Sequence, residues 1–566
     1  MGETGNTGAS DAPGETATDY VLGVDLGTGG AKVALVSTAG AVLGHEFAAT
    51  TVDLLPDGGA EQDPDGWWQA IVGATRRLLD RADLPSERIV AACMSAQWGG
   101  TVAVDEHGTA LHPALIWMDS RGGALSRRLT GGGIEVPGTG YNAARLARWL
   151  RRTGGVPTRT GKDPVGQIQW LRHERPEVFA AARWFLDVPE YLTMRLTGEA
   201  VAAYDTVVLR WCTDNRDPYD VRYDPGLVAL CGLDAAKLPR LVPPATVVGR
   251  ITPAAAHELG LGTHVQVVAG TGDTTAAAVG AGAVLDHQAH LYVGTSSWLS
   301  CHVPAKKTDL RTNVASLPSV VPGRYWVATV QDVAGKALTW LVDNVLYADD
   351  ELASGDVVGT TGTAGTAGTA GAPGAPDDVL DRLNAVAAKV PPGSHGVVFT
   401  PWLNGERTPV DDQRLRGGWF NVSLATDRAT LVRAVFEGVA LNARWMQDAV
   451  EGFVRRARPN GFDGLTFVGG GASSALWCQI MADVLDRPIR QADDPVLANV
   501  RGAGLIGAVA LGRLAWDDVP GTVAIRETFT PDPGVRATYD RLYRTFVDLH
   551  RRNKSLYARH NRFPWS

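Results

Sequence analysis

Short apolar runs that end in glycine alternate with longer amphipathic segments along most of the chain. Residues 20–25 are apolar up to a final aspartate, and a second apolar run over residues 31–36 follows Gly27-Thr28-Gly29-Gly30. Two such runs around a glycine turn predict a β-hairpin. Residues 67–84 carry apolar side chains at helical spacing, which predicts a helix, and residues 89–94 and 101–104 predict further strands.

The middle of the chain repeats this opening. Residues 266–269 predict a strand that leads into Gly270-Thr271-Gly272-Asp273. A second hairpin is predicted where Gly294-Thr295-Ser296-Ser297 separates residues 290–293 from residues 298–303. One hairpin of the same kind in each half predicts two related lobes that face each other across a cleft.

The last third continues the alternation of helices and strands. Residues 427–453 predict a long helix, and residues 465–468 predict a strand that ends at Gly469-Gly470-Gly471. A helix is predicted from about residue 473 to residue 485. The basic helix predicted from residue 537 onward is expected to pack one apolar face on a lobe, in preference to binding a partner.

Length and composition limit the class of protein. A chain of 566 residues exceeds the ~250–300 residues that one hydrophobic core supports, so we expect two domains. Hydrophobic residues make up 45% and charged residues 20%, as in globular proteins, and no apolar run reaches the ~18 residues of a membrane span. The net charge of −8 disfavours nucleic acid and anionic lipid as partners.

The cysteines and the low-complexity segments bear on location and flexibility. Five scattered cysteines without a Cys-x-x-Cys pair predict reduced thiols in a cytoplasmic protein. Residues 1–18 lack the features of a signal peptide and are expected to be a disordered tail. Residues 355–376 are mostly Gly, Thr, Ala and Pro, which predicts a flexible loop inside a domain.

The first glycine turn has the chemistry of a phosphate site. It is not a dinucleotide fingerprint, because Lys32 stands where the third glycine should be and the chain continues as a strand. A Walker phosphate loop is absent from the sequence. Asp25, the turn amides, Thr28 and Lys32 suit a polyphosphate chelated to magnesium. The alternative is a plain hairpin turn with an exposed aspartate.

Three further segments admit two interpretations each. Asp273 at a strand end is suited to act as a general base on a hydroxyl group, or it caps the next helix. The segment Gly469-Gly470-Gly471-Ala472-Ser473 either approaches a flat ligand or makes a tight crossover. Gly405-Glu406-Arg407-Thr408-Pro409 is either a loop facing the cleft or a surface turn.

Together these segments resemble the actin-like ATPase superfamily. Its two phosphate motifs and its adenosine motif resemble Asp25-Leu26-Gly27-Thr28, Gly294-Thr295-Ser296 and Gly469-Gly470-Gly471-Ala472. Within that superfamily the chain is similar to the FGGY carbohydrate kinases, and to their xylulokinases above all, from about residue 20 to residue 512. This similarity also rests on Glu61-Gln62-Asp63-Pro64 with Trp67-Trp68, Ile116-Trp117-Met118-Asp119-Ser120-Arg121, Tyr191-Leu192 with Arg195-Leu196-Thr197-Gly198-Glu199, Ala269-Gly270-Thr271-Gly272-Asp273 and Gly405-Glu406-Arg407-Thr408-Pro409.

The resemblance implies an α/β fold of two actin-like (ribonuclease H-like) lobes, each a mixed β-sheet flanked by helices, with a cleft between them. Residues 19–283 would bind the sugar and residues 284–566 the nucleotide. Asp273 would be the general base, and Asp25 and Asp273 would hold Mg²⁺. Contacts to ATP are implied for Gly27, Thr28, Gly29, Lys32, Gly294, Thr295, Ser296, Gly335, Gly470, Gly471 and Ala472. Contacts to the sugar are implied for Gln97, Trp98, Gly99, Asp119, Arg121, Asp273 and Thr274.

Four departures from the xylulokinase pattern concern the sugar. Gln97-Trp98-Gly99-Gly100 stands where Gln-Met-His-Gly is usual, and Gln167 replaces a common lysine. Val422-Ser423 replaces Gly-Leu, and Thr274 replaces an asparagine. The Trp98 indole offers a flat apolar face and one N–H donor, and Gly99 leaves space beside it. We expect phosphorylation of D-xylulose or of a related pentulose or polyol by ATP, in the cytoplasm, and leave a homodimer open.

Other functions remain as alternatives. A kinase of this family could act on a ribulose, a hexulose, another polyol or gluconate. A non-catalytic protein that senses a nucleotide or a sugar is disfavoured by the presence of both Asp25 and Asp273, because a sensor needs no base. A redox enzyme with a nicotinamide cofactor is disfavoured by the strand that follows the first glycine turn.

Overall fold

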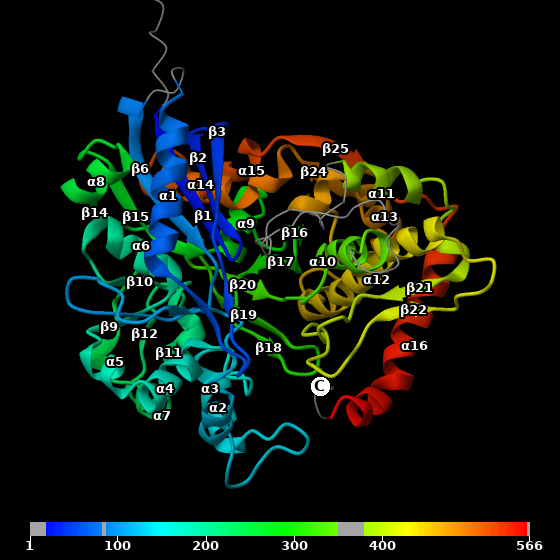
Figure 1. Cartoon of the computed structure of the whole chain (residues 1–566), viewed down its shortest axis with the longest axis horizontal. Coiled ribbons are helices and arrows are strands. Elements are labelled where there is room, and N and C mark those ends of the chain that lie inside the picture. Colours follow the sequence, from blue (N-terminus) through cyan, green and yellow to red (C-terminus); the bar gives the residue numbers. More distant parts are fainter. Residues whose placement is uncertain (1–18, 82–85, 349–377, 563–566) are drawn as a thin grey trace, which may run out of the picture.

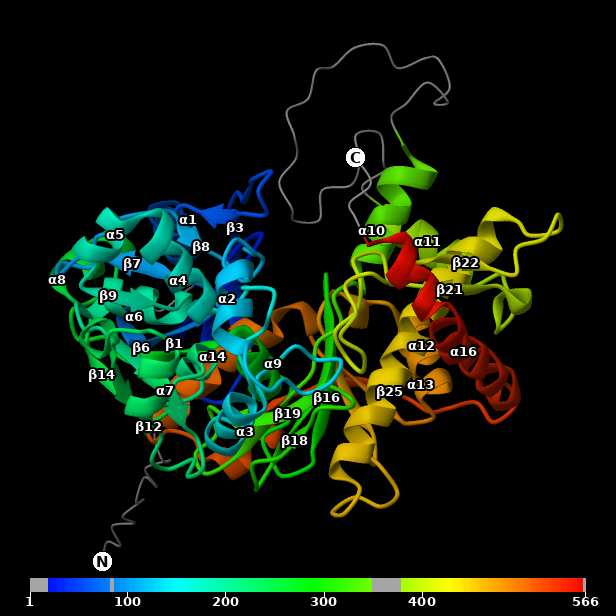
Figure 2. The ribbon, with the colours of Figure 1, turned by 90° about the horizontal axis from the view of Figure 1, so that it is seen from below.

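The structure is a computed structural model that describes residues 19–81, 86–348 and 378–562. The predicted tail at residues 1–18 and the predicted loop at residues 355–376 lie outside the described residues. The described chain forms two lobes, each built on one large mixed β-sheet (Figure 1, Figure 2). In the described ranges, no helix is long and apolar enough to cross a membrane.

The sheet of the N-terminal lobe begins with the predicted hairpin. β1 (Tyr20–Gly27) pairs antiparallel with β2 (Gly30–Ser37), and β1 runs parallel to β6 (Ile89–Ala96). Both strands of the hairpin are almost continuously apolar because helices cover both faces of the sheet. The order of the sheet is β14-β15-β6-β1-β2-β3, which adds β14 (Val247–Arg250), β15 (Gln266–Gly272) and β3 (Val42–Ala49).

The sheet of the C-terminal lobe repeats this plan. Its order is β18-β19-β20-β17-β16-β23-β24-β25. Six of these strands, from β20 to β25, match the order and the directions of β3-β2-β1-β6-β15-β14 in the other lobe. The match confirms two related lobes. The strands are β18 (Thr308–Asp309), β19 (Val314–Pro318), β20 (Tyr325–Ala328), β17 (Ser297–Val303), β16 (Ala289–Val293), β23 (Leu465–Val468), β24 (Ile489–Ala492) and β25 (Ile525–Phe529).

Amphipathic helices cover the sheets. α1 (Pro64–Leu79), α6 (Val188–Thr197) and α8 (Pro253–Leu259) bury their apolar faces on the N-terminal sheet. α1 ends five residues earlier than predicted, at Asp80, whose N–H donates to the carbonyl of Arg76. In the C-terminal lobe, α12 (Arg428–Val454), α13 (Ala475–Leu485) and α16 (Arg536–His560) share one core, which confirms the expected packing of the last helix.

Two helices pack against each other between the lobes. α9 (Asp273–Gly280) and α14 (Ala498–Ala510) cross where Gly280 faces the carbonyl of Ala498 and Gly502 faces the carbonyl of Ala276. A Cβ atom at either glycine would collide with that backbone, so only glycine permits the close crossing. α14 belongs to the second predicted domain but packs on β1 and β6, as the orange helix among the blue strands shows (Figure 1).

Smaller elements complete the N-terminal lobe. Its smaller helices pack around Trp149, Trp211 and neighbouring apolar side chains in a separate core. These helices are α2 (Gly123–Thr130), α3 (Ala143–Arg152), α4 (Pro164–Glu174), α5 (Pro176–Ala181) and α7 (Pro225–Leu230).

Short sheets join further strands of the N-terminal lobe. They pair β4 (Asp53–Leu54), β5 (Ala60–Gln62) and β8 (Ala114–Leu115), β7 (Val102–Val104) with β9 (Trp184–Leu186), β10 (Val201–Ala203) with β13 (Arg240–Val242), and β11 (Thr213–Asp214) with β12 (Arg222–Tyr223). The C-terminal lobe adds α10 (Lys336–Leu341), α11 (Val379–Ala387), α15 (Val519–Thr522) and the pair of β21 (Val398–Thr400) and β22 (Gly418–Phe420).

Candidate active site

Two carboxylates stand at one edge of the N-terminal sheet. β1, β6 and β15 are parallel neighbours, and their register sets Asp25 beside Ser95 and Ser95 beside Thr271. Asp273 follows at the end of β15, so the same edge carries both acids. The carboxyl ends of parallel strands are where ligands bind in open α/β sheets.

The environment of these acids alters their protonation. Burial raises the pKa of Asp25, against the opposing effects of Lys32 and of hydrogen bonds from Ser95 Oγ (3.1 Å) and Asn499 Nδ2 (3.4 Å). Burial raises the pKa of Asp273 to about 7, and the charge of Asp25 adds to the effect. A carboxylate with a pKa near neutrality is matched to proton transfer under cellular conditions.

The helix-cap interpretation of Asp273 is compatible with the role of general base that the sequence predicts. Asp273 is the first residue of α9, after the N-cap Gly272, and its Oδ1 accepts a hydrogen bond from the N–H of Thr274 at 2.8 Å. One oxygen of the half-buried carboxylate is thereby oriented. The hydroxyl of Thr274 is buried and has no partner among the described residues, so it is a polar group in need of a ligand.

The pair Asp25 and Asp273 fits a hydrated divalent cation. The described ranges contain no cluster of three or more His, Cys, Asp or Glu side chains able to hold a metal. Mg²⁺ commonly takes only one or two protein carboxylates and completes its shell with water and substrate phosphates. The mutual charge that raises the pKa of Asp273 is the kind of repulsion that a shared cation relieves.

The turn of the N-terminal hairpin is held by side-chain hydrogen bonds. The Thr28 hydroxyl donates to Gln97 Oε1 at 3.0 Å and accepts from Trp117 Nε1 at 3.0 Å. Gln62 Nε2 donates to the Thr28 carbonyl at 3.0 Å, and Gln97 Nε2 donates to Gln62 Oε1 at 2.6 Å. The side chains of Thr28 and Gln97, expected to contact ATP and sugar, are therefore bonded to protein groups, and Gly27 and Gly29 bring only backbone to the turn.

Lys32 lies opposite Asp25 in the hairpin register. Its ammonium donates to the carbonyl of Val496 at 2.8 Å, a contact with a distant segment of the chain that the sequence does not reveal. The charge of Lys32 also lowers the pKa of Asp25, which places it electrostatically at the carboxylate. Its expected contact with phosphate stays a prediction.

The turn of the C-terminal hairpin is open by comparison. Thr295 is exposed, and its carbonyl accepts from the N–H of Ala334 at 2.9 Å. Gly335 donates its N–H to the carbonyl of Gly294 at 2.8 Å, and a Cβ at Gly335 would stand 2.5 Å from that carbonyl. The predicted ATP residues Gly294, Thr295, Ser296 and Gly335 are therefore brought together.

The third glycine segment combines both interpretations that the sequence allows. Gly469 has φ +88°, and its Cβ would lie 2.6 Å from the carbonyl of Val293, so a close crossover requires glycine there. Gly471 and Ala472 are buried below the turn, whereas Gly470 is exposed and has open space around its Cβ position. Gly470 is thus the position at which a ligand can approach the backbone.

The Trp98–Gly100 turn adjoins the strand end that carries Asp273. The ring of Trp98 lies 3.3 Å from a Cβ position on Gly272, the residue before Asp273, and 6.2 Å from the ring of Trp326 in the other lobe. The Trp98 N–H donates to the carbonyl of Thr206 at 2.9 Å, so the donor is already engaged. The ring of Trp98 is half-buried, and its expected contact with a sugar stays a prediction.

The side chains of Asp187 and Gln167 hold this turn in place. Asp187 accepts from the N–H groups of Gly99 and Gly100, both at 3.2 Å. Gln167, which departs from the xylulokinase pattern, donates to the carbonyl of Gly99 at 3.2 Å. Gly99 has φ +86°, so glycine serves the backbone conformation there. A Cβ position on Gly99 lies 3.2 Å from Leu209 Cδ1, so the space that we expected beside Trp98 is filled by Leu209.

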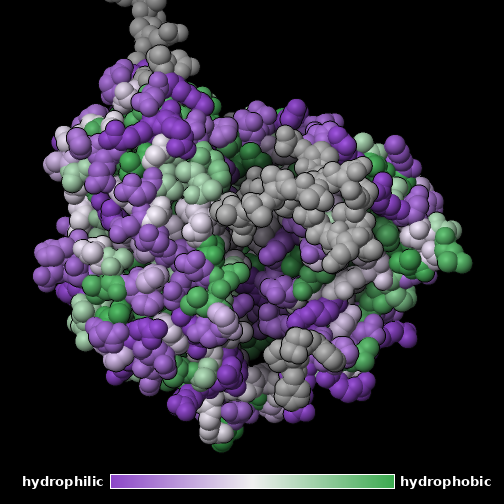
Figure 3. All heavy atoms as spheres, viewed as in Figure 1, coloured by the Kyte–Doolittle hydropathy of each residue, from purple (hydrophilic) through white to green (hydrophobic). Residues whose placement is uncertain are grey.

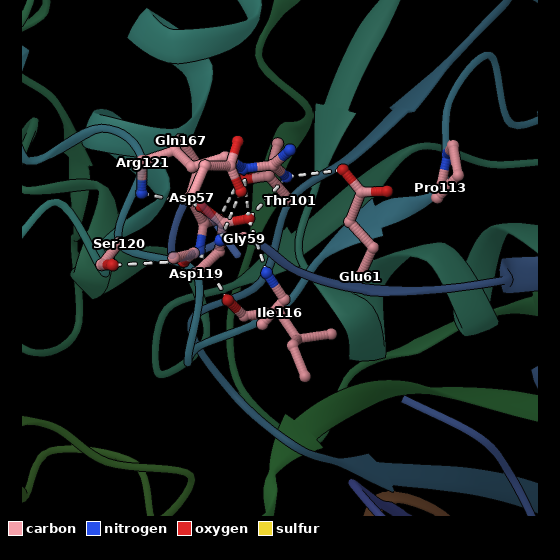
Figure 4. A network of polar contacts seen from close by, with 12 residues as sticks. Asp57, Gly59, Glu61, Thr101, Pro113, Ile116, Asp119, Ser120, Arg121 and Gln167 are labelled. Carbon is pink, nitrogen blue, oxygen red and sulfur yellow. Dashed lines mark hydrogen bonds and ion pairs between the residues drawn. The ribbon is translucent and has the colours of Figure 1, made fainter. Parts of the chain in front are cut away.

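Asp119 and Arg121 form a buried ion-pair network (Figure 4). Arg121 Nη2 lies 2.6 Å from Asp119 Oδ2 and 2.5 Å from Glu61 Oε1, and Asp119 also accepts from the N–H of Ala60 at 3.0 Å. The Asp119 side chain is wholly buried and its hydrogen bonds are internal. Both residues, expected to contact sugar, are thus bonded within the wall of the lobe.

The segment Gly405-Glu406-Arg407-Thr408-Pro409 faces the cleft. Arg407 lies 5.7 Å from the ring of Trp117 in the N-terminal lobe and is paired with Asp332. Glu406 is buried, and burial raises its pKa to about 8 although Asn442 donates to it. The molecular surface is hollowed where the lobes meet (Figure 3).

Two lobes on related sheets, with two carboxylates at the edge of one sheet and glycine turns in both lobes, form an actin-like fold. The chain matches the FGGY family of carbohydrate kinases, in its N-terminal domain over residues 20–280 and in its C-terminal domain over residues 289–511. The protein belongs to this family of carbohydrate kinases.

Individual relatives agree with the family. Xylulose kinase from Staphylococcus epidermidis is 25% identical over 547 residues, which are 95% of this chain and 98% of that protein. Gluconokinase from Bacillus subtilis is 25% identical over 547 residues, covering 96% and 97%. The crystal structure of xylulose kinase from Rhodospirillum rubrum has a TM-score of 0.75 at 27% identity and covers 95% of this chain and 99% of that one.

Proposed function

We propose that this carbohydrate kinase transfers the γ-phosphoryl group of ATP to D-xylulose and forms D-xylulose 5-phosphate. The observation that carries the proposal is Asp273, whose pKa burial raises to about 7. It stands beside the apolar face of Trp98 and the unpartnered hydroxyl of Thr274. These groups suit a sugar that presents one hydroxyl to a base and a C–H face to an indole.

In this mechanism Asp273 takes the proton of the accepting hydroxyl as the new O–P bond forms. The bond from the γ-phosphorus to the β,γ-bridging oxygen breaks, and ADP leaves. Asp25 and Asp273 would hold Mg²⁺, which when bound neutralises charge on the phosphate oxygens. The backbone of Gly27 and Gly29 and the hydroxyls of Thr295 and Ser296 would hold phosphate oxygens from the two lobes.

Gluconate is a second candidate substrate, favoured by the gluconokinase relative of equal identity. A sugar acid would need a cation near its carboxylate. The guanidinium of Arg407 at the cleft already pairs with Asp332, so its charge is balanced without a substrate carboxylate. This pairing favours the neutral ketose over gluconate as the substrate.

A coupled assay of ADP release across D-xylulose, D-ribulose, hexuloses, polyols and gluconate tests the proposal. We expect the highest kcat/KM with D-xylulose and a requirement for added Mg²⁺. A preference for gluconate by a factor of ten or more would replace the assigned sugar, and no turnover with any member of the panel would remove the proposed function. We also propose a cytoplasmic location, which the five free and buried cysteines support.

A further inference from the structure

Tyr292 occupies the position in the C-terminal lobe that Asp25 occupies in the N-terminal lobe. β16 corresponds to β1 in the two sheets, and each leads into a Gly-Thr turn. Asp25 stands two residues before Gly27, and Tyr292 stands two residues before Gly294. Because side chains alternate along a strand, equivalent positions of the two lobes direct their side chains in equivalent ways toward the cleft.

The ring of Tyr292 lies between the Gly294-Thr295 turn and the glycine segment that begins at Gly469. It stacks on Trp298, its partner in the hairpin register, with centroids 3.9 Å apart and planes 3° apart. Its Oη lies 2.8 Å from a Cβ position on Gly294, and its Cε2 lies 3.2 Å from one on Gly469. Glycine at both places makes room for this ring, so the hydroxyl is fixed next to the Gly294-Thr295 turn.

Core packing connects Tyr292 to the elements that carry the two acids. Tyr292 packs against a core cluster to which α9 and α14 contribute. α9 begins at Asp273, and α14 carries Asn499, which donates to Asp25. Burial raises the pKa of Tyr292, and the charges of Asp25 and Asp273 raise it further, so the phenol stays protonated. The side chain is half-buried, which leaves its edge accessible to a ligand in the cleft.

We propose that Tyr292 is a catalytic residue whose hydroxyl donates a hydrogen bond to an oxygen of the phosphoryl group in transfer. The proposal rests on the proposed kinase function. A neutral donor suits this position, because a second strand-end carboxylate facing Asp25 would repel the phosphate. The duplicated lobes thus place an acid on one side of the transferred group and a hydrogen-bond donor on the other.

Tyr292→Phe tests the proposal because it removes one oxygen and keeps the ring that stacks on Trp298. We expect kcat to fall about 10-fold or more, the scale of a lost transition-state hydrogen bond. KM for the sugar, the affinity for ADP and the melting temperature should stay unchanged. Tyr219→Phe, which alters an exposed tyrosine, is the matched control and should behave as wild type.

The outcomes separate this proposal from the proposed function. A variant whose kcat stays within twofold of an active wild type overturns the role of Tyr292 and leaves the kinase function standing. A loss of kcat matched by an equal loss of ADP affinity and a lower melting temperature also overturns it, because the hydroxyl would then be structural. A wild-type chain inactive on every sugar overturns both.

Discussion

The two hairpin turns that face each other across the cleft have related backbones and different chemistry. In the N-terminal turn, Thr28 is bonded through its side chain to Gln97 and Trp117, and the flanking strands pair Asp25 with Lys32. In the C-terminal turn, Thr295 is exposed, and the flanking strands pair Tyr292 with Trp298. The N-terminal turn is held by side-chain hydrogen bonds and flanked by a charged pair. The C-terminal turn is exposed and flanked by an aromatic pair.

This difference between the turns indicates that the two lobes have different roles in the proposed reaction. In the N-terminal lobe, internal hydrogen bonds hold the acids and the turn, which suits the proposed base and metal site. The C-terminal lobe presents a free hydroxyl and glycine backbone, which suits a nucleotide that enters and leaves in each cycle. Variants on either side should therefore fail in different ways.

The largest effect is expected from Asp273→Asn. The amide keeps the shape of the side chain but cannot accept a proton, so kcat should fall by roughly 10²-fold or more. The melting temperature should change little. Steady-state kinetics on the purified variant measures kcat. Turnover near the wild-type rate would show that another residue is the general base.

Asp25→Ala should weaken the binding of Mg²⁺ and leave the proposed proton transfer to Asp273 in place. The Mg²⁺ concentration for half-maximal activity should rise by about 10-fold, since one of two carboxylates is lost. The affinity for the sugar should be retained, as measured by calorimetry without nucleotide. An unchanged dependence of activity on Mg²⁺ would contradict the assignment of Asp25.

Gly335→Ala and Gly470→Ala form a matched pair on the open side. The Cβ atom that Gly335→Ala adds would press on the carbonyl of Gly294 from 2.5 Å, so we expect a loss of stability of about 1–3 kcal/mol and a higher KM for ATP. At Gly470 no heavy atom lies within 4 Å of the Cβ position, so stability should be unchanged. A KM for ATP raised only by Gly470→Ala would locate the nucleotide there.

The smallest effects should come from the two turn threonines. Thr28→Val removes the hydroxyl that donates to Gln97 Oε1 and accepts from Trp117 Nε1, so the free energy of unfolding should fall by roughly 1–3 kcal/mol. Thr295→Val should leave stability unchanged and raise the KM for ATP several-fold, about the value of one hydrogen bond. Denaturant melts and kinetics on both variants would show whether the turns differ as described, and identical behaviour would remove the distinction.

Much of the fold follows from local sequence. Apolar runs bounded by glycine predicted both hairpins and β23, and the amphipathic patterns predicted α12, α13 and α16 to within a few residues. The helix at residues 67–84 was predicted too long, because the cap at Asp80 is weaker in the sequence than the apolar pattern that follows it. The duplication was visible because the same turn chemistry occurs twice.

The candidate site was predicted in part. The sequence identified Asp25 and Asp273 because a carboxylate that ends an apolar strand before glycine is a local signal. It did not reveal that the Trp98 donor is bonded to Thr206 or that Asp119 is buried with Arg121, and the expected contacts of these residues with sugar stay predictions. Asp187 and Tyr292 carry no local signal that marks them.

The two hairpins, the long helices, the two strand-end acids and the three glycine segments follow from local sequence, since each depends on neighbouring residues. Which polar side chains keep a free group depends on contacts between distant parts of the chain. Thr28 meets Gln97, Trp98 meets Thr206 and Asp25 meets Asn499 across 69, 108 and 474 positions of the chain. Such partners are selected by packing of the whole molecule, and burial by that same packing sets the pKa of Asp273, so no local pattern contains either one.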